Sequence, residues 1–239
     1  MNIVATNITK VFGMGHTAVR AVDGVSLTIR EGEIILIMGP SGSGKTTLLT
    51  ILGGLLSPTS GSVRVGNTDI TFLKENVLPE FRLKNIGFIF QTFNLLSALN
   101  AAENAAVPLI ARGTSRKKSL GEAGELLTRL GLENRLFNMP SDLSGGEKQR
   151  VAIARALITD PGIIFADEPT ANLDSKNGHE VVIRLCAIAC ENHKTVVIVS
   201  HDQRIKDIAY RILWLEDGKI TGEEQGRHKD VCPHEKDIT

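Results

Sequence analysis

A glycine-rich loop between an apolar strand and a helix constrains the fold of this chain more than any other stretch. The loop comprises Gly39, Pro40, Ser41, Gly42, Ser43, Gly44, Lys45, Thr46 and Thr47. An apolar run over residues 33–38 precedes it, and a helical pattern over residues 48–52 follows it. This order is typical of a phosphate-binding loop, because glycine lets backbone N–H groups approach an anion at a helix N-terminus. The pattern assigns Lys45 to the β- and γ-phosphates of a nucleotide and the Thr46 hydroxyl to Mg²⁺.

The remaining pattern predicts an α/β fold interrupted by a helical stretch. Strand patterns occur at residues 2–12, 19–29, 62–65, 86–90, 162–168 and 195–200, with a closing hairpin at 210–215 and 219–220. Helical patterns occur at residues 101–110, 119–130, 147–157 and 175–191. Residues 72–83 have helical spacing interrupted by Pro79, so their structure stays open.

We therefore expect one domain over residues 1–223 with a P-loop NTPase core of the RecA-like type and a mainly parallel sheet. The core comprises residues 1–91 and 159–223 and carries an antiparallel β subdomain. Residues 92–158 form an inserted all-helical subdomain, and residues 224–239 form a polar tail.

Composition narrows the functional class. The chain of 239 residues carries 27 basic and 27 acidic side chains, which argues against a nucleic-acid-binding protein. No apolar run approaches the ~18–20 residues of a membrane span, and residues 1–6 lack a signal-peptide pattern. We expect a cytoplasmic protein that meets a membrane only through a partner.

Three cysteines do not suggest a disulfide framework. Cys186 and Cys190 lie four residues apart on an expected helix, where a buried apolar face is favoured over a metal site. Cys232 lies in the polar tail, which we expect to be solvated and disordered.

Two carboxylates follow the apolar stretch at residues 163–166. Asp167 and Glu168 are delivered to the carboxyl end of a strand, where α/β sheets bind their ligands. Asp167 is placed to hold Mg²⁺ through water, and Glu168 to polarise an attacking water. The alternative is an ordinary strand that ends in solvated acids, which the nearby phosphate loop disfavours.

A second anion-binding loop occurs before the helix at 147–157. Ser144 is a helix N-cap, and Gly145 and Gly146 expose N–H groups at the positive end of that helix. One nucleotide does not need two such loops from one protomer. Two protomers arranged head-to-tail would each offer this loop to the partner's γ-phosphate, which predicts an isologous dimer with two nucleotides at its interface. The alternative is a plain serine cap beside a flexible glycine pair.

These motifs, in this order and spacing, resemble the ATP-binding subunit of an ABC transporter. The resemblance covers the chain to about residue 223 and rests on the phosphate loop, Gln91, Leu143, Ser144, Gly145, Gly146, Asp167, Glu168, Asn172, Leu173, Asp174 and His201.

The resemblance implies a role for each matching position. Phe12 would stack on adenine, where the family more often has tyrosine; edge-strand packing is the alternative. Gln91 would reach Mg²⁺ and the attacking water and join the core to the helical subdomain. Asp174 would communicate between the two ATP sites, and His201 would contact the γ-phosphate.

The Ser144 loop with Glu147, which replaces the common glutamine, would close on the partner's ATP. The resemblance thus implies that the catalytic residues are Glu168, His201, Lys45 and Gln91. It implies that the residues that bind Mg²⁺ are Thr46, Gln91 and Asp167.

Residues 87–96 and 102–104, together with 167–174, resemble the macrolide-export and lipoprotein-release subfamily, the MacB, LolD and DevA types. MacB carries its permease on the same chain, and the sequence shows no such segment, so we expect a separate permease subunit as partner, with a periplasmic adaptor as an option. Such systems are exporters, or they extract lipids or lipoproteins. Two alternatives remain open: an ATPase that drives a mechanical membrane complex, and a soluble ATPase of this fold that works without a permease.

A surface for this membrane partner is expected beside Gln91. Phe93, Leu95, Leu96 and Leu99 are four apolar residues close behind a motif loop and could accept a partner's helix. The alternative is that they pack the helical subdomain on the core.

Overall fold

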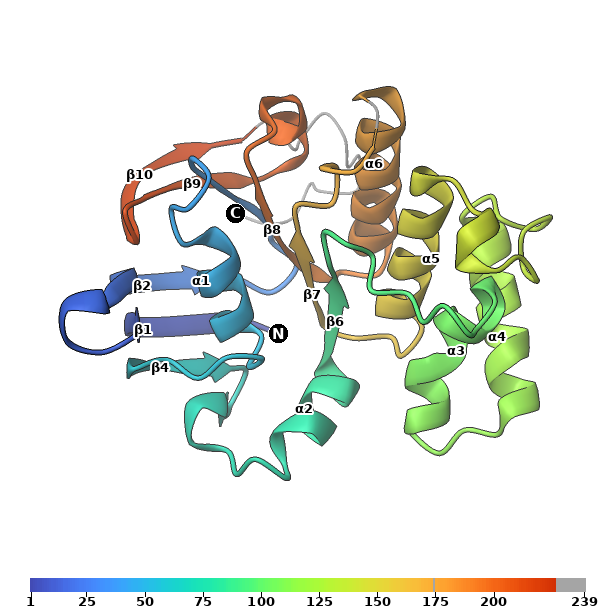
Figure 1. Ribbon diagram of the computed structural model, residues 1–239, viewed down its shortest axis with the longest axis horizontal. Coiled ribbons are helices and arrows are strands. Elements are labelled where there is room, and N and C mark those ends of the chain that lie inside the picture. Colours follow the sequence, from blue (N-terminus) through green and yellow to red (C-terminus); the bar gives the residue numbers. More distant parts are fainter. Residues whose placement is uncertain (174, 227–239) are drawn as a thin grey trace.

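The computed structural model describes residues 1–173 and 175–226, which form two β-sheets with helices between and beside them (Figure 1). In chain order the elements are β1 (Ile3–Phe12), η1 (Gly15–Thr17), β2 (Val19–Ile29), β3 (Ile34–Met38), α1 (Lys45–Leu52), β4 (Ser60–Val65), β5 (Thr68–Asp69), η2 (Ile70–Phe72), α2 (Leu78–Asn85), β6 (Ile86–Ile89), α3 (Ala101–Ala111), α4 (Arg116–Arg129), η3 (Pro140–Asp142), α5 (Gly145–Leu157), β7 (Ile163–Asp167), α6 (Ser175–Glu191), β8 (Thr195–Ser200), η4 (Gln203–Ile208), β9 (Arg211–Glu216) and β10 (Lys219–Gln225).

The larger sheet has the strand order β10-β9-β3-β8-β7-β6. The pairs β9–β3, β3–β8, β8–β7 and β7–β6 are parallel, and only the edge strand β10 pairs antiparallel, with β9. Strands in a parallel sheet are covered on both faces, so they consist of continuous apolar runs. All five side chains of β3 are 0% exposed, which accounts for the apolar run that precedes the glycine-rich loop.

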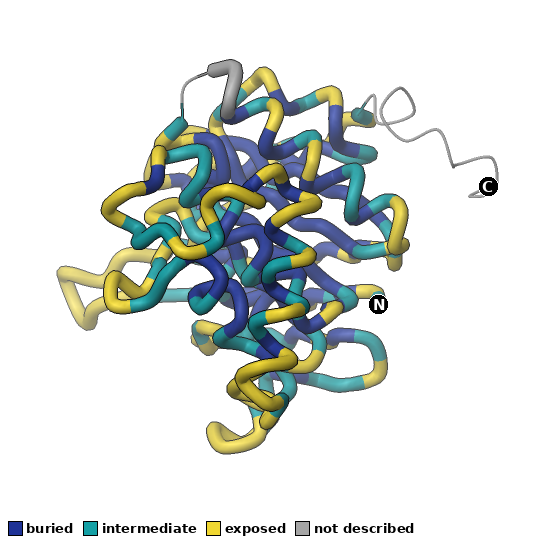
Figure 2. Tube along the Cα trace, turned by 90° about the vertical axis from the view of Figure 1, so that its right-hand side faces the viewer, coloured by how far each residue is buried: buried dark blue, intermediate teal, exposed yellow. Residues whose placement is uncertain are grey.

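The two faces of β3 contribute to two different cores. Ile34, Leu36 and Met38 pack with the helices α3 to α6, whereas Ile35 and Ile37 pack with α1 and the smaller sheet. The smaller sheet is antiparallel with the order β2-β1-β4-β5. Figure 2 shows the buried segments gathered in the middle of the molecule and the exposed loops around them. Helix α1 therefore begins at the junction of the two sheets.

Helices α3, α4 and α5 gather at one end of the molecule, away from the smaller sheet (Figure 1). Asn100 and Ser144 each accept a hydrogen bond from the N–H of a glutamate three residues later, and that glutamate's carboxylate accepts in return, which is a capping box. These caps fix where α3 and α5 begin. The residues between β6 and β7 contain helices, as expected for an inserted helical part, and its boundaries at 92 and 158 remain a proposal.

The predicted fold class is confirmed, and most predicted elements are found within a few residues of their expected ends. One stretch that the sequence left open is now assigned, and one strand differs in length. Residues 78–85 form α2, and Pro79 lies in its first turn. An N–H group at this position has no partner within the helix, so proline is tolerated there. Strand β10 continues to Gln225, beyond the two residues expected for it, and takes in the first two residues of the expected tail.

Cys186 is fully buried in α6 and Cys190 packs against the same core, as expected for an apolar helix face. Cys190 also takes part in a disulfide bond, which the cysteine pattern did not predict. Burial raises the pKa of the Cys186 thiol to about 12. The tail with Cys232 and the expected site residue Asp174 lie outside the described residues. In the described part of the chain, no helix is both long and apolar enough to cross a membrane.

Candidate nucleotide-binding site

Four parallel strands end at the same edge of the larger sheet and deliver the site residues there. The glycine-rich loop follows β3, Gln91 follows β6, Glu168 follows β7 and His201 follows β8. Because the carboxyl ends of parallel strands meet at one edge, residues that are far apart in sequence converge. They line a hollow of about 500 Å³ together with Ala21, Pro40, Ser41, Gly42, Gly44, Lys45, Thr46 and Thr47.

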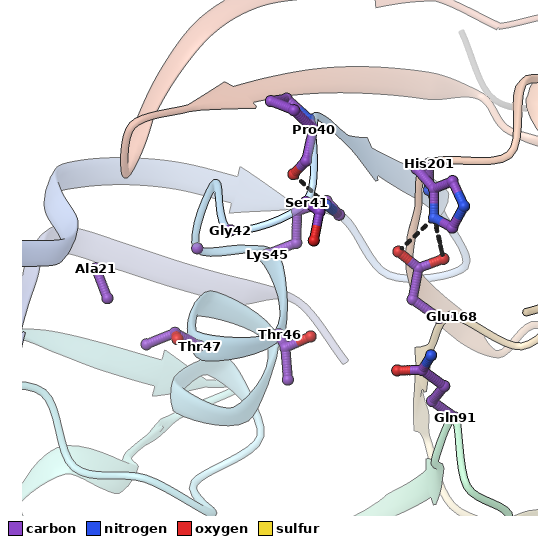
Figure 3. A pocket seen from close by; sticks show the side chains of 11 residues that line it. Ala21, Pro40, Ser41, Gly42, Lys45, Thr46, Thr47, Gln91, Glu168 and His201 are labelled. Carbon is purple, nitrogen blue, oxygen red and sulfur yellow. Dashed lines mark hydrogen bonds and ion pairs between the residues drawn. The ribbon is translucent and has the colours of Figure 1, made fainter.

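Figure 3 shows Gln91, Glu168 and His201 on one side of this hollow, facing the glycine-rich loop and α1 on the other. The structure thus brings seven of the nine loop residues together with the three distant motif residues that the sequence assigned to the same site.

The backbone of the loop requires glycine at Gly44. Its φ is +98°, and a Cβ there would lie 2.1 Å from the carbonyl oxygen of Ala21 on β2. Lys45 is 6% exposed, and its ammonium donates to the carbonyl oxygens of Gly39 at 2.9 Å and Pro40 at 2.8 Å. The loop therefore forms a closed ring around a cation at the N-terminus of α1, which favours an anion in the hollow.

Thr46 and Asp167 form the part of the site that fits a divalent cation. The Thr46 hydroxyl donates to Asp167 Oδ1 at 2.8 Å. Burial raises the pKa of Asp167, and the hydrogen bond from Thr46 opposes that shift. A hydroxyl and a carboxylate are the hard oxygen ligands that Mg²⁺ prefers, so these two residues, with Gln91 nearby in the hollow, suit that ion.

Glu168 and His201 lie in direct contact. The His201 Nδ1 is 3.0 Å from each carboxylate oxygen of Glu168, and the hydroxyl of Ser200 donates to Oε2 at 3.1 Å. Glu168 has a φ of +45° and is 9% exposed. A non-glycine residue in the left-handed region is costly and persists where its surroundings fix it, as at many functional sites. The carboxylate is thus held at the rim of the hollow by two side chains of β8 and its following loop.

The Ser144 loop does not line this hollow. Ser144, Gly145 and Gly146 begin α5 on the helical side of the molecule, and Glu147 is bound locally. The Glu147 carboxylate accepts from the Ser144 N–H at 2.7 Å and pairs with Arg135 at 2.8 Å. A direct contact from Glu147 to a phosphate would set two negative charges against each other, so its observed partners favour a role in shaping the loop.

This capping geometry gives a pH-dependent prediction. Arg135 first, with the Ser144 N–H and hydroxyl, lowers the pKa of Glu147 from 4.5 to about 2. A lowered folded-state pKa contributes stability above pH 4.5 that is lost as the pH falls toward 2. Between pH 5 and pH 2.5 the wild type should lose up to about 2 kcal/mol more of its free energy of unfolding than Glu147→Gln. Urea titrations of both proteins at the two pH values measure this difference, and equal losses would contradict it.

Phe12 lies outside the residues that line the hollow. Its ring is 43% exposed near the end of β1, and the Lys10 ammonium lies 5.2 Å from the ring centre. An exposed aromatic ring at this position is free to stack on a planar ligand, and the stacking role remains a prediction. Its neighbours Met14 and Val19 are also exposed.

Sequence reasoning missed Ala21 and Ser200, and it named Asn172 as a motif residue without assigning a contact to it. Ala21 lines the hollow, Ser200 binds Glu168, and Asn172 donates to the carbonyl oxygen of Gln91 at 2.6 Å. Ser200 directly precedes His201, and this adjacency was the one available signal. The contact of Asn172 depends on the tertiary arrangement, which no local pattern indicates.

The four apolar residues expected to form a partner surface beside Gln91 differ in their exposure, and their role stays a prediction. Leu95 packs against the main core, whereas Leu96 is 51% exposed. A hollow of about 270 Å³ lies close to this segment, and none of the four residues lines it. It is lined by Pro79, Arg82, Leu83, Ile86, Gly87, Phe88, Phe90, Pro108, Arg155, Ala156 and Thr159.

Comparisons with known proteins agree with these features. The sequence model of the family described as ABC transporter matches residues 22–171. The chain is 44% identical over 217 residues to the lipoprotein-releasing system ATP-binding protein LolD of Geobacter metallireducens, covering 91% of this chain and 96% of that protein. It is 45% identical over 225 residues to the macrolide export ATP-binding/permease protein MacB of Rhodospirillum rubrum, covering 94% of this chain and 34% of that protein.

An ABC transporter ATP-binding protein of Mycobacterium tuberculosis is 44% identical over 210 residues, which is 88% of this chain and 63% of the relative. The chain thus spans less than two thirds of the mycobacterial relative and about a third of MacB. Among solved structures, the ATP-binding cassette MJ0796 in a dimeric post-hydrolysis state with ADP and Pi superposes with a TM-score of 0.88 at 43% identity. That match covers 93% of this chain and 98% of MJ0796.

Proposed function

The chain belongs to the ABC transporter ATP-binding family, and from this premise we propose that two copies bind and hydrolyse MgATP to drive a membrane protein. The observation that carries the proposal is the convergence of the glycine-rich loop, Glu168 and His201 on one hollow. The resemblance to MacB and LolD points to an exporter or a system that extracts lipids or lipoproteins, acting at the cytoplasmic face of the membrane.

Within one protomer, the residues of the hollow divide the chemistry. Lys45 and the loop N–H groups bind the phosphates and neutralise their charge. Glu168 accepts a proton from the attacking water as a general base, and His201 and Ser200 hold its carboxylate in place. Gln91 lies on the same side as Glu168 and orients the water. Thr46 and Asp167 would hold Mg²⁺, which supplies positive charge beside the phosphates when bound.

A second copy completes the site in this proposal. The Ser144 loop lies outside the hollow of its own protomer, and its two glycines begin α5 at the positive end of that helix. A head-to-tail partner would place this loop against the phosphates in the opposite hollow. The dimeric MJ0796 structure supports this arrangement, and the reciprocal contact of Ser144, Gly145 and Gly146 is the proposed part.

We place the membrane partner in the hollow between α2, β6, α3 and α5. Phe88, Phe90 and Leu83 supply apolar wall there, and Arg82 and Arg155 supply charge. Neither arginine forms an ion pair within the described part of the chain, and burial lowers the pKa of both guanidinium groups. An apolar wall with two unpaired cations fits a helix that presents apolar side chains and a carboxylate. We therefore expect a separate permease with such a helix, and any periplasmic adaptor would bind the permease.

Capture from native membranes tests the proposal. Tagged Glu168→Gln protein is added with MgATP to detergent-solubilised membranes of the native cells, and the bound material is identified. We expect a stoichiometric integral membrane protein, because slow hydrolysis keeps the closed dimer populated. Recovery of DNA or ribosomes in its place would support a soluble ATPase of this fold and overturn the assignment.

The matched control is Leu83→Glu in the same background. It adds a negative charge to the wall of the 270 Å³ hollow and touches no residue of the nucleotide site. Capture should be lost while ATP binding is retained. Undiminished capture would exclude this hollow as the docking site. The ectodomain of the captured protein then separates an exporter from a mechanical complex that moves no cargo.

A further inference from the structure

Arg155, near the end of α5, forms hydrogen bonds with the backbone of the segment that follows Gln91. Its Nη1 donates to the Asn94 carbonyl oxygen at 2.5 Å, and its Nη2 donates to the Phe93 carbonyl oxygen at 2.6 Å. The guanidinium is half-buried and forms no ion pair with any described carboxylate. A desolvated cation that binds only carbonyl oxygens fixes the backbone that carries them.

The backbone that Arg155 binds adopts a conformation that is uncommon for non-glycine residues, and local bonds from the Phe93 and Asn94 N–H groups also hold it. Phe93 and Asn94 have φ values of +61° and +48°, so two consecutive non-glycine residues are left-handed. This conformation is costly for L-residues, and a phenylalanine tolerates it less well than an asparagine. It persists where neighbouring groups over-determine it, and the two arms of Arg155 do so here.

Helix α5 connects these hydrogen bonds to the other anion-binding loop. The helix begins directly after Ser144, and Arg155 lies eleven residues later, about 16 Å along its axis. Val151, Ala152 and Ala154 are fully buried, so α5 is packed along its length. Helix α5 therefore forms a continuous, packed connection between the segment after Gln91 and the Ser144 loop.

Arg155 also forms part of the wall of the 270 Å³ hollow, together with Phe90, the last residue before Gln91. The same side chain thus touches the hollow, the segment after Gln91 and the helix of the Ser144 loop. Asn172 adds a second tie to this segment by donating to the Gln91 carbonyl oxygen at 2.6 Å.

We propose that Arg155 is a positioning residue that locks the Gln91 segment to α5, so that Gln91 and the Ser144 loop move as one unit when the hollow is occupied. The joint movement on occupation of the hollow rests on the proposed function, whereas the positioning of the Gln91 segment by Arg155 does not. The guanidinium is suited to this role because its planar fork reaches two carbonyls at once, which a lysine ammonium on a single stem does not.

The test separates binding from turnover. In Arg155→Gln, kcat for ATP hydrolysis should fall by at least about tenfold, because Gln91 and the Ser144 loop lose their relative placement. The affinity of the protomer for a fluorescent ATP analogue (mant-ATP) should stay within about twofold, because the glycine-rich loop is untouched. Arg155→Lys keeps the charge and most of the side chain, should show the same split, and carries the test if Arg155→Gln does not fold.

Arg112→Gln is the matched control. Arg112 also donates to one backbone carbonyl, that of Thr159 at 2.9 Å beside the same hollow, but does not touch the Gln91 segment. Its kcat should match the wild type. A second arm adds Asn94→Gly to Arg155→Gln, since glycine adopts the left-handed conformation without cost. Partial recovery of kcat is expected from this double variant.

Wild-type kcat in both Arg155 variants would overturn the inference, as would an equal loss in Arg112→Gln or a failure of Asn94→Gly to restore any turnover. The wild type distinguishes these outcomes from a failure of the proposed function. If the wild type hydrolyses ATP and the Arg155 variants do the same, only the positioning role is wrong.

Discussion

Glu168→Gln is expected to bind ATP as tightly as the wild type and to hydrolyse it about a thousandfold more slowly. Glutamine has the shape of glutamate and can still accept from Ser200, which donates to Glu168 Oε2 at 3.1 Å. The hollow therefore keeps its form. An amide does not accept a proton from water at neutral pH, so the general base is lost while the phosphate-binding groups remain.

Single-turnover hydrolysis and ATP titration measure the two effects separately, and size-exclusion chromatography with MgATP reports whether the variant accumulates as a dimer. Glu216→Gln is the control, because it makes the same chemical change on an exposed carboxylate at the end of β9. Wild-type turnover in Glu168→Gln would assign water activation to another group, and His201→Gln would be examined next because His201 contacts Glu168.

Local sequence predicted the parts of the site that lie at strand ends. The runs before Gly39, Gln91, Glu168 and His201 are short and continuously apolar, which indicates buried parallel strands and places the following residues at one sheet edge. The order of six strands in the larger sheet was not predicted, since that order depends on how the helices cross over.

Tertiary contacts between residues that are far apart in the chain were not predicted from the sequence. Arg155 belongs to a helix that the sequence did predict, but its carbonyl partners are 61 and 62 residues away. The sequence predicted a partner surface at Phe93, Leu95, Leu96 and Leu99, whereas the hollow that we propose for the partner lies between α2 and α5. Apolar character alone does not separate the two, because Leu95 in the expected set packs inward against the core.

Gly44→Ala is expected to weaken ATP binding severely while leaving the protein folded. The residue has a φ of +98°, which L-residues rarely adopt, and an added Cβ would lie 2.1 Å from the Ala21 carbonyl oxygen. That atom belongs to the backbone of β2 and cannot rotate away. The loop must then open, which moves Lys45 and the loop N–H groups away from the position where they converge on an anion. We expect the affinity for ATP to fall at least about a hundredfold.

Gly32→Ala is the control that separates the steric contact of an added Cβ from the strain of a left-handed backbone. Gly32 lies in the turn between β2 and β3 with a φ of +77°, and no atom lies within 4 Å of its added Cβ. This variant should lose about 1 kcal/mol of stability from the left-handed backbone and bind ATP like the wild type. Isothermal titration gives both affinities, and thermal melting gives both stabilities. If Gly44→Ala retained its affinity, the contact with Ala21 would not shape the loop, and the phosphate site would tolerate a looser ring than the one around Lys45.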